Sequence, residues 1–198
     1  MRGKRKLFFM FLALCLMLAI RPETASAAGG SISVNGTDIL SAPDHQVSCG
    51  SGAAAYDPDT KVLRLDNAVI GSTAGSAVQY GVEITEPGVT VELIGENTIN
   101  AHFGIYSEQP LTIKGTGGGL LINIVQDPSI PGNPCRGIYA KKGGLTIRDT
   151  DIRLTTGTIT ANSAYAVDSW GGDNQIINST IRIAMQPLKD PDESCTGI

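Results

Sequence analysis

Short alternations of apolar and polar residues recur along the chain and predict many short β-strands. A first unit returns at steps of 23, 33, 29 and 31 residues, as Gly81-Val82-Glu83, Gly104-Ile105-Tyr106, Gly137-Ile138-Tyr139, Ala166-Val167-Asp168 and Gly197-Ile198. A second alternating segment follows each unit, as in 111–113, 145–147 and 175–177, and a third closes the cycle, as in 122–124 and 152–154. Alternation with a period of two is typical of a strand with one buried face, and no helical apolar period is visible. Each repeat therefore holds three short strands.

Three short strands per repeat predict an all-β fold, a right-handed single-stranded parallel β-helix. One coil cannot bury its apolar face alone, whereas stacked coils pair in parallel about 4.8 Å apart and build a continuous core. Two inward columns are expected, the first of Val82, Ile105, Ile138 and Val167 and the second of Ile84, Ser107, Ala140 and Ser169. The variable steps fall in loops over 126–134, 156–164 and 186–194, which are rich in turn-forming residues.

The two ends of the repeat series differ. Residues 28–70 are expected to form an N-terminal cap and the first strands, with an Asn35-Gly36 hairpin turn. Residues 71–198 then hold the coils. Residues 194–198 copy 134–138, so the coil series is expected to be incomplete at its C-terminal end. Asn67, Asp149 and Asn178 each precede a third strand by three residues, and these residue types tolerate the left-handed conformation of a tight corner.

Residues 1–27 have the layout of a signal peptide. A positive start that includes Arg2 and Lys4 precedes an apolar run over 7–20, and Ala25-Ser26-Ala27 is an A-x-A cleavage pattern. The run is shorter than the roughly 20 residues that span a bilayer. We expect cleavage after Ala27, a secreted or cell-surface protein, and no membrane contact by the mature domain.

Removal of this signal changes the charge balance. The chain carries 15 basic and 19 acidic residues; without the five basic residues and one Glu of 1–27 it carries 10 and 18, a net charge of −8. An acidic surface disfavours nucleic acid and anionic lipid as partners. Phe103 and Trp170 are the only Phe and Trp after residue 27, so Val, Ile and Leu must fill the core.

Three groups of residues carry a resemblance to a known family. They are Tyr56-Asp57-Pro58-Asp59-Thr60 before 63–68, the stretch 91–99, and the Gly-Ile-Tyr and Leu-Thr-Ile units. These stretches resemble the exported β-helix "carbohydrate-binding domain-containing" proteins of Gram-positive bacteria, over roughly residues 32–198. The resemblance implies a pectate-lyase-like fold that binds plant cell-wall or other complex polysaccharide, with calcium in some members. Its motifs identify the scaffold and assign no sugar or calcium residue.

One outward column is the candidate carbohydrate-binding site. Glu83, Tyr106, Tyr139 and Asp168 fall at the same repeat position, and Trp170 is expected to face out beside Asp168. Tyr106 and Tyr139 are expected to be adjacent exposed rings. Flat aromatic surfaces beside hydrogen-bonding groups suit a sugar ring, which has an apolar CH face and polar edges. The alternative interpretation is a solvated ladder that only covers the sheet.

Calcium is a second candidate ligand. Asp190, Asp192 and Glu193 cluster in one loop, and Asp127 lies in the equivalent loop of an earlier coil. Calcium prefers several carboxylate and carbonyl oxygens, but the spacing is not that of an EF-hand. A solvated acidic loop explains the same residues, so no metal ligand is assigned.

Two further classes of function stay open. A polysaccharide lyase or hydrolase would use grouped carboxylates with a basic residue, and the one dense group is Asp149 and Asp151 with Arg148 and Arg153. No partner carboxylates are visible in neighbouring repeats, so we expect a binding protein rather than an enzyme and assign no catalytic residue. A structural stalk or adhesin module of a surface protein is the remaining alternative.

Overall fold

The computed structural model describes residues 29–72, 78–130, 132–157, 159, 163–186 and 194–196, the last three by their backbone alone. These residues form β-strands and one short 3-10 helix, Pro43–His45. The expected all-β class is therefore confirmed. The expected signal peptide at 1–27 lies outside the described residues.

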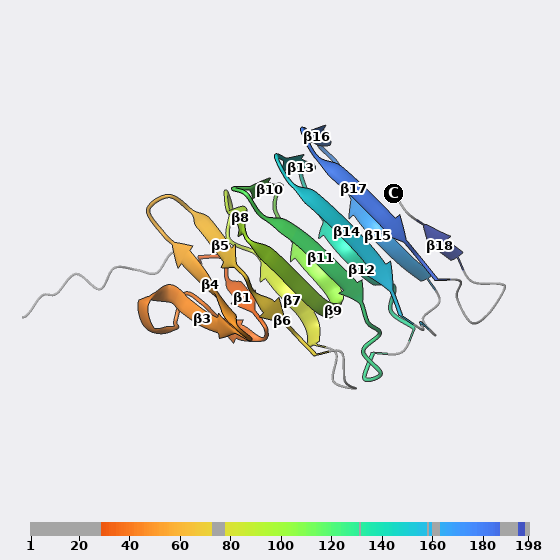
Figure 1. The fold of residues 1–198 in the computed structure, drawn as a ribbon, viewed down its shortest axis with the longest axis horizontal. Helices are drawn as coiled ribbons and strands as arrows, with labels where there is room; N and C mark the ends of the chain where they lie inside the picture. Colours follow the sequence, from red (N-terminus) through yellow and green to blue (C-terminus); the bar gives the residue numbers. More distant parts are fainter. Residues whose placement is uncertain are drawn as a thin grey trace, which may run out of the picture.

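The strands form two sheets, and within each sheet the strands follow one another along the long axis of the molecule (Figure 1). Sheet A contains β1 (Ile32–Val34), β2 (Thr37–Asp38), β6 (Val69–Ile70), β7 (Val78–Ile84), β9 (Glu96–Ser107), β11 (Gly119–Ile124), β12 (Cys135–Ala140), β14 (Asp151–Thr156), β15 (Ser163–Ser169), β17 (Thr180–Ala184) and β18 (Ser194–Thr196). Sheet B contains β3 (Gln46–Cys49), β4 (Gly52–Asp57), β5 (Val62–Asp66), β8 (Thr90–Ile94), β10 (Leu111–Gly115), β13 (Leu145–Arg148) and β16 (Gln175–Ile177).

Parallel pairing joins strands that lie about one repeat apart in the sequence. In sheet B the parallel series is β5, β8, β10, β13 and β16. Sheet A has two such series that share β9: residues 96–101 of β9 pair with β11, and residues 103–107 pair with β12. The two parallel series of sheet A are therefore joined through β9, whose two halves pair with different strands.

The register confirms both expected inward columns. Val82 pairs with Ile105, Ile105 with Ile138 and Ile138 with Val167, and the second column is aligned in the same way. Two later segments pair differently from the sequence alignment. Ile122 pairs with Leu154 instead of Ile152, and Ile147 pairs with Ile176 instead of Ile177. The first shift is two residues, so the same face stays inward.

Apolar side chains from both sheets form one core. Leu63, Val91 and Ile113 of sheet B and Val82 and Ile105 of sheet A all have no exposed surface. Because each strand contributes its alternate residues to this core, the fold relies on aliphatic side chains, as the small number of aromatic residues requires.

The N-terminal residues close one end of the molecule with antiparallel strands. β1 and β2 form the expected hairpin, in which Asn35 (φ 52°) and Gly36 (φ 76°) have the positive φ angles of a two-residue turn. β1 also pairs antiparallel with β7, and β3, β4 and β5 form an antiparallel run.

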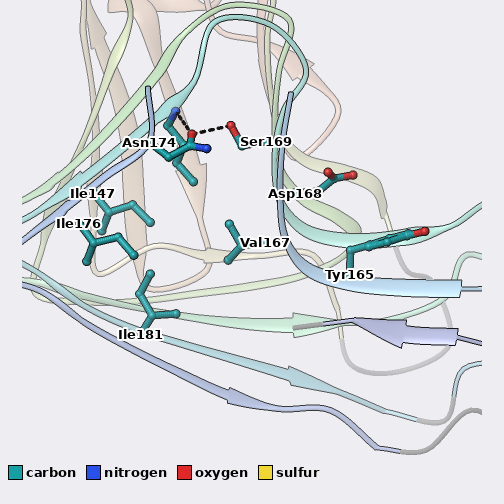
Figure 2. A pocket seen from close by; sticks show the side chains of 9 residues that line it. Ile147, Tyr165, Val167, Asp168, Ser169, Asn174, Ile176 and Ile181 are labelled. Atoms are coloured by element: carbon teal, nitrogen blue, oxygen red, sulfur yellow. Dashed lines mark hydrogen bonds between the residues drawn. The ribbon is translucent and has the colours of Figure 1, made fainter. Parts of the chain in front are cut away.

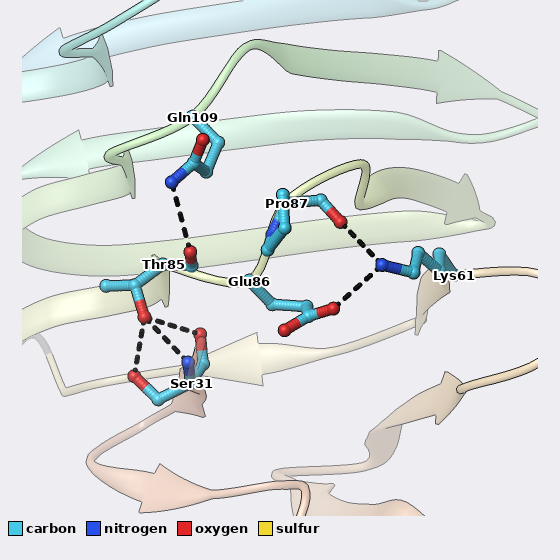
Figure 3. Close-up of polar contacts among 6 residues, drawn as sticks. All are labelled: Ser31, Lys61, Thr85, Glu86, Pro87 and Gln109. Carbon is cyan, nitrogen blue, oxygen red and sulfur yellow. Dashed lines mark hydrogen bonds and ion pairs between the residues drawn. The ribbon is translucent and has the colours of Figure 1, made fainter. Parts of the chain in front are cut away.

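Polar side chains tie this cap to the first parallel strands (Figure 3). The Ser31 backbone N–H donates to Oγ1 of Thr85 at 2.6 Å, and Gln109 Nε2 donates to the Thr85 carbonyl at 3.3 Å. Lys61 forms an ion pair with Glu86 at 2.8 Å and also donates to the carbonyl of Pro87. Each of these contacts joins residues that are at least 24 positions apart in sequence.

At the opposite end of the described strands, apolar side chains of β16 are exposed. Ile176 is 56% exposed although its register partner Ile147 is fully buried, and Ile177, which pairs with the exposed Arg148, is 42% exposed. A cavity of about 280 Å³ is lined by Ile176, and Figure 2 shows Ile147, Val167 and Ile181 pointing toward it. The same figure shows Asp168 and Tyr165 on the other side of β15, so this strand separates the core from an outward face.

The predicted corner residues have the expected backbone. Asn67, Asp149 and Asn178 have φ angles of 48°, 55° and 47°, which is the left-handed region. Asn178 Nδ2 donates to Oδ1 of Asp149 at 3.2 Å, so one corner is linked to the next. These residues therefore have a structural role.

Candidate functional site

The expected outward column is aligned as the sequence predicts. Glu83 pairs with Tyr106, Tyr106 with Tyr139, and Tyr139 with Asp168, so the four residues cross β7, β9, β12 and β15 in one row. Trp170 follows directly after the end of β15.

The expectation that Tyr106 and Tyr139 expose their rings is wrong. Their exposed fractions are 8% and 6%, because they pack against Phe103 in a second apolar cluster on the outer side of sheet A. The ring centroids of Tyr106 and Tyr139 lie 5.5 Å apart. Tyr80 stacks on Phe103 at 4.9 Å, and Ile130 from the loop after β11 covers the cluster.

A second outward row lies beside the first and was not foreseen. Register pairing aligns Tyr80, Phe103, Arg136 and Tyr165. Phe103 and Tyr106 share a face although they are three residues apart, so the alternation of β9 breaks between them. The two rows together with Trp170 make up a surface that we call the aromatic face.

Close backbone stacking accompanies this break in alternation, with glycine at the break in β7, β9 and β12 and the small Ala166 in β15. Gly81, Gly104 and Gly137 precede the inward column, and a Cβ on Gly104 would lie 2.4 Å from the Gly137 carbonyl oxygen and 2.7 Å from Cγ2 of Ile122. The backbone therefore approaches its neighbours too closely for any side chain. The sequence signal was the glycine of the Gly-Ile-Tyr unit, whose steric meaning depends on the stacking of the repeats.

Arg136 lies at the centre of the aromatic face. Its Nε donates to Oδ2 of Asp168 at 2.7 Å, and both side chains are 14% exposed. The guanidinium carbon lies 4.4 Å from the centroid of the Tyr139 ring, 5.2 Å from that of Tyr165 and 5.9 Å from that of Phe103. Cation–π contact and a charge-assisted hydrogen bond together hold this side chain in one orientation.

A polar group borders the rings on one side. Tyr106 Oη donates to Oε1 of Glu108 at 2.8 Å, and Lys141 Nζ donates to the same carboxylate oxygen at 2.9 Å. Hydrogen bonding from Lys141 lowers the pKa of Glu108, and the partnership raises the pKa of Lys141. Burial raises the pKa of Tyr106, so its phenol stays protonated and acts as a donor.

Glu83 differs from the other carboxylates of the face. It is half-buried and has no cationic partner among the described residues. Burial raises the pKa of Glu83, and the nearby charge of Glu108 raises it further. A half-buried carboxylate without a cation is an available hydrogen-bond acceptor.

Trp170 is the exposed ring of the aromatic face, with 57% of its surface accessible. Its Nε1 donates to Oδ1 of Asp168 at 2.9 Å. The indole also meets the Tyr139 ring edge-on, with centroids 5.9 Å apart and an interplanar angle of 74°. Asp168 therefore joins Trp170 to Arg136, one through each carboxylate oxygen.

The acidic calcium candidates do not converge where they are described. Asp127 accepts hydrogen bonds from the backbone N–H and the hydroxyl of Ser129, which is a local turn contact. Asp190, Asp192 and Glu193 lie outside the described residues. Within the described ranges, no group of three or more His, Cys, Asp or Glu side chains is placed to hold a metal ion.

No carboxylate pairs directly with Asp151, whose register partners are Gly119 and Thr180, but an acid lies one strand further along the column. Gly119 pairs with Glu96 on one side and with Asp151 on the other, so the two acids share an outward column with a glycine between them. A shallow hollow of about 280 Å³ contains both, together with Arg153. Arg148 and Asp149 are also exposed, and Asp149 belongs to the turn column.

No family model, curated protein or solved structure matches the chain. Function must therefore be argued from the geometry of the aromatic face. In the part of the chain that the structure describes, no helix is both long and apolar enough to cross a membrane.

Proposed function

We propose that this protein binds carbohydrate on the aromatic face, with Trp170 as the ring that contacts the sugar. The observation that carries this proposal is an exposed indole whose orientation is fixed by Asp168 and Tyr139. An exposed aromatic ring normally moves among rotamers, so a fixed one has less entropy to lose on binding.

The chemistry of the face matches that of a sugar. The exposed indole offers a flat apolar surface for the CH face of a pyranose ring. Asp168 and Glu83, on the same outward row, offer carboxylate oxygens to the hydroxyl groups at the ring edge. Apolar contact combined with a few placed polar groups is the usual composition of a small-molecule site.

The proposed scaffold is a right-handed parallel β-helix, exported to the cell surface or beyond. Three parallel strand series that advance by one repeat at a time support the helical arrangement. The signal-like residues 1–27 support export. A complex polysaccharide outside the cell is the ligand class that both features favour.

The test compares Trp170→Ala with the parent chain by calorimetry against cell-wall oligosaccharides. Loss of the ring should weaken binding by about 1–3 kcal/mol, a magnitude measured for aromatic stacking on nucleic-acid bases. Trp170→Phe should retain part of the affinity. Val69→Ala removes a 41% exposed apolar side chain elsewhere and is the matched control. Equal affinity of parent and Trp170→Ala would remove the aromatic face from consideration.

A structural module is the second candidate. The burial of Tyr106 and Tyr139 favours it, because these rings pack against each other and leave little surface for a ligand. If the protein is a stalk or adhesin module, no glycan in a broad array should bind it although it is folded and thermally stable. Trp170→Ala should then lower the melting temperature only slightly and have no other effect.

A further inference from the structure

Every cation at the centre of the aromatic face is already occupied. Arg136 is held by Asp168 at 2.7 Å and lies against three aromatic rings. Asp168 already neutralises this guanidinium, so an anionic ligand that reached its other N–H groups would also meet the Asp168 carboxylate at short range, and that repulsion opposes binding.

Lys141 is occupied in a similar way. Its ammonium group binds Glu108 at 2.9 Å and the Tyr106 hydroxyl at 3.2 Å, and it lies 5.9 Å from the centroid of the Tyr106 ring. Lys142 is exposed and forms no ion pair among the described residues, and its charge acts on the same Glu108 carboxylate. Lys142 is therefore the cation of this region that no carboxylate of the described residues neutralises.

The available acceptors on the same surface are anionic. Glu83 has no cationic partner in the described part of the chain, and Asp168 keeps lone pairs beyond the two hydrogen bonds that it accepts. Hydroxyl groups of a sugar are donors and suit these oxygens. A ligand carboxylate or sulfate would instead face like charges at short range.

We propose that the aromatic face selects uncharged, hydroxyl-rich sugar rings over uronates and sulfated sugars, with Glu83 as the residue that excludes the negative charge. This inference rests on the proposed carbohydrate-binding function. The net charge of −8 that remains without residues 1–27 acts in the same direction, since it repels a polyanion before contact.

The experiment uses ligands that differ in charge alone. An oligogalacturonide and its methyl ester share one backbone, and neutral cello-, xylo- and manno-oligosaccharides extend the panel. Binding is followed by calorimetry and by the fluorescence of Trp170, which is the only Trp in the chain. We expect neutral members to bind, the ester to bind about tenfold more tightly than the free uronate, and neutral binding to be unchanged between about 20 and 300 mM NaCl.

Two variants locate the cause of the selectivity. Glu83→Gln keeps one acceptor and removes the charge, so the ratio of ester affinity to uronate affinity should fall about threefold. Glu83 also accepts hydrogen bonds from sugar hydroxyls in the proposed site, so the readout is this ratio and not the absolute affinity for neutral sugars. Lys142→Gln should leave neutral binding unchanged. Tighter binding of the free uronate, weakened by salt and by Lys142→Gln, would overturn the selectivity and leave carbohydrate binding intact. No binding by any panel member would overturn both proposals.

Discussion

Replacing Gly104 with alanine tests the steric origin of the aromatic face. The new Cβ would lie 2.4 Å from the Gly137 carbonyl oxygen and 2.7 Å from Cγ2 of Ile122. The first neighbour is backbone in the next strand and cannot rotate away, so β9 and β12 must separate. Overpacking of this kind costs about 1–3 kcal/mol, and the rigid neighbour places Gly104→Ala near the upper end.

The assay is thermal and urea unfolding of the parent and the variant. A loss of about 2–3 kcal/mol corresponds to a fall of roughly 5–10 °C in melting temperature for a chain of this length. Gly157→Ala is the matched control, because a Cβ there meets nothing within 4 Å and its φ is not in the left-handed region. That change should be neutral or slightly stabilising. Equal melting temperatures for the two variants would refute the stacked-glycine explanation.

Two other side chains give independent tests. His102 is fully buried, burial lowers its pKa below the ordinary value of 6.5, and its Nδ1 accepts the Asp127 N–H at 3.1 Å. Its contribution to stability should be complete above pH 6.5 and be lost as the pH falls toward the folded-state pKa, by about 1 kcal/mol per pH unit. The urea midpoint of His102→Gln should therefore fall less steeply with acid than that of the parent, and equal slopes would contradict this reasoning. Tyr139→Ala should lower the free energy of unfolding by about 3 kcal/mol, because the ring is 6% exposed, whereas Tyr139→Phe should lower it by less than about 1 kcal/mol. Denaturant unfolding measures both variants. An unchanged free energy of unfolding for Tyr139→Ala would contradict the burial of this ring.

The sequence predicts the strand register well because the repeats carry matched inward residues. Ile105 and Ile138 both follow a glycine, and the structure pairs them with no exposed surface. The corner residue Asn67 was also predictable, since few side chains tolerate a positive φ. Such features depend on local chemistry that repeats, so a single sequence contains them.

Burial on the outward side could not be predicted in the same way. Alternation shows that Tyr106 points away from the core. It does not show that Tyr80 and Phe103 lie on the same outward face and pack against the Tyr106 ring. Glu96 and Asp151 lie on either side of Gly119 in one outward column, and this alignment depends on the register of three strands. Both features arise from contacts between repeats whose lengths differ.

The buried rings and the exposed ring of the aromatic face have different roles in binding. Tyr139 lies beneath Arg136 and against the edge of Trp170, so it fixes the two groups that border the ligand without offering much surface itself. Asp168 completes this arrangement through its two oxygens. Truncating a buried ring would therefore shift Arg136 and Trp170 and also destabilise the fold. A loss of affinity in such a variant would not measure contact between the ring and the sugar. Trp170 is the residue at which contact can be measured alone, since its loss leaves the Arg136–Asp168 pair and the packed rings in place.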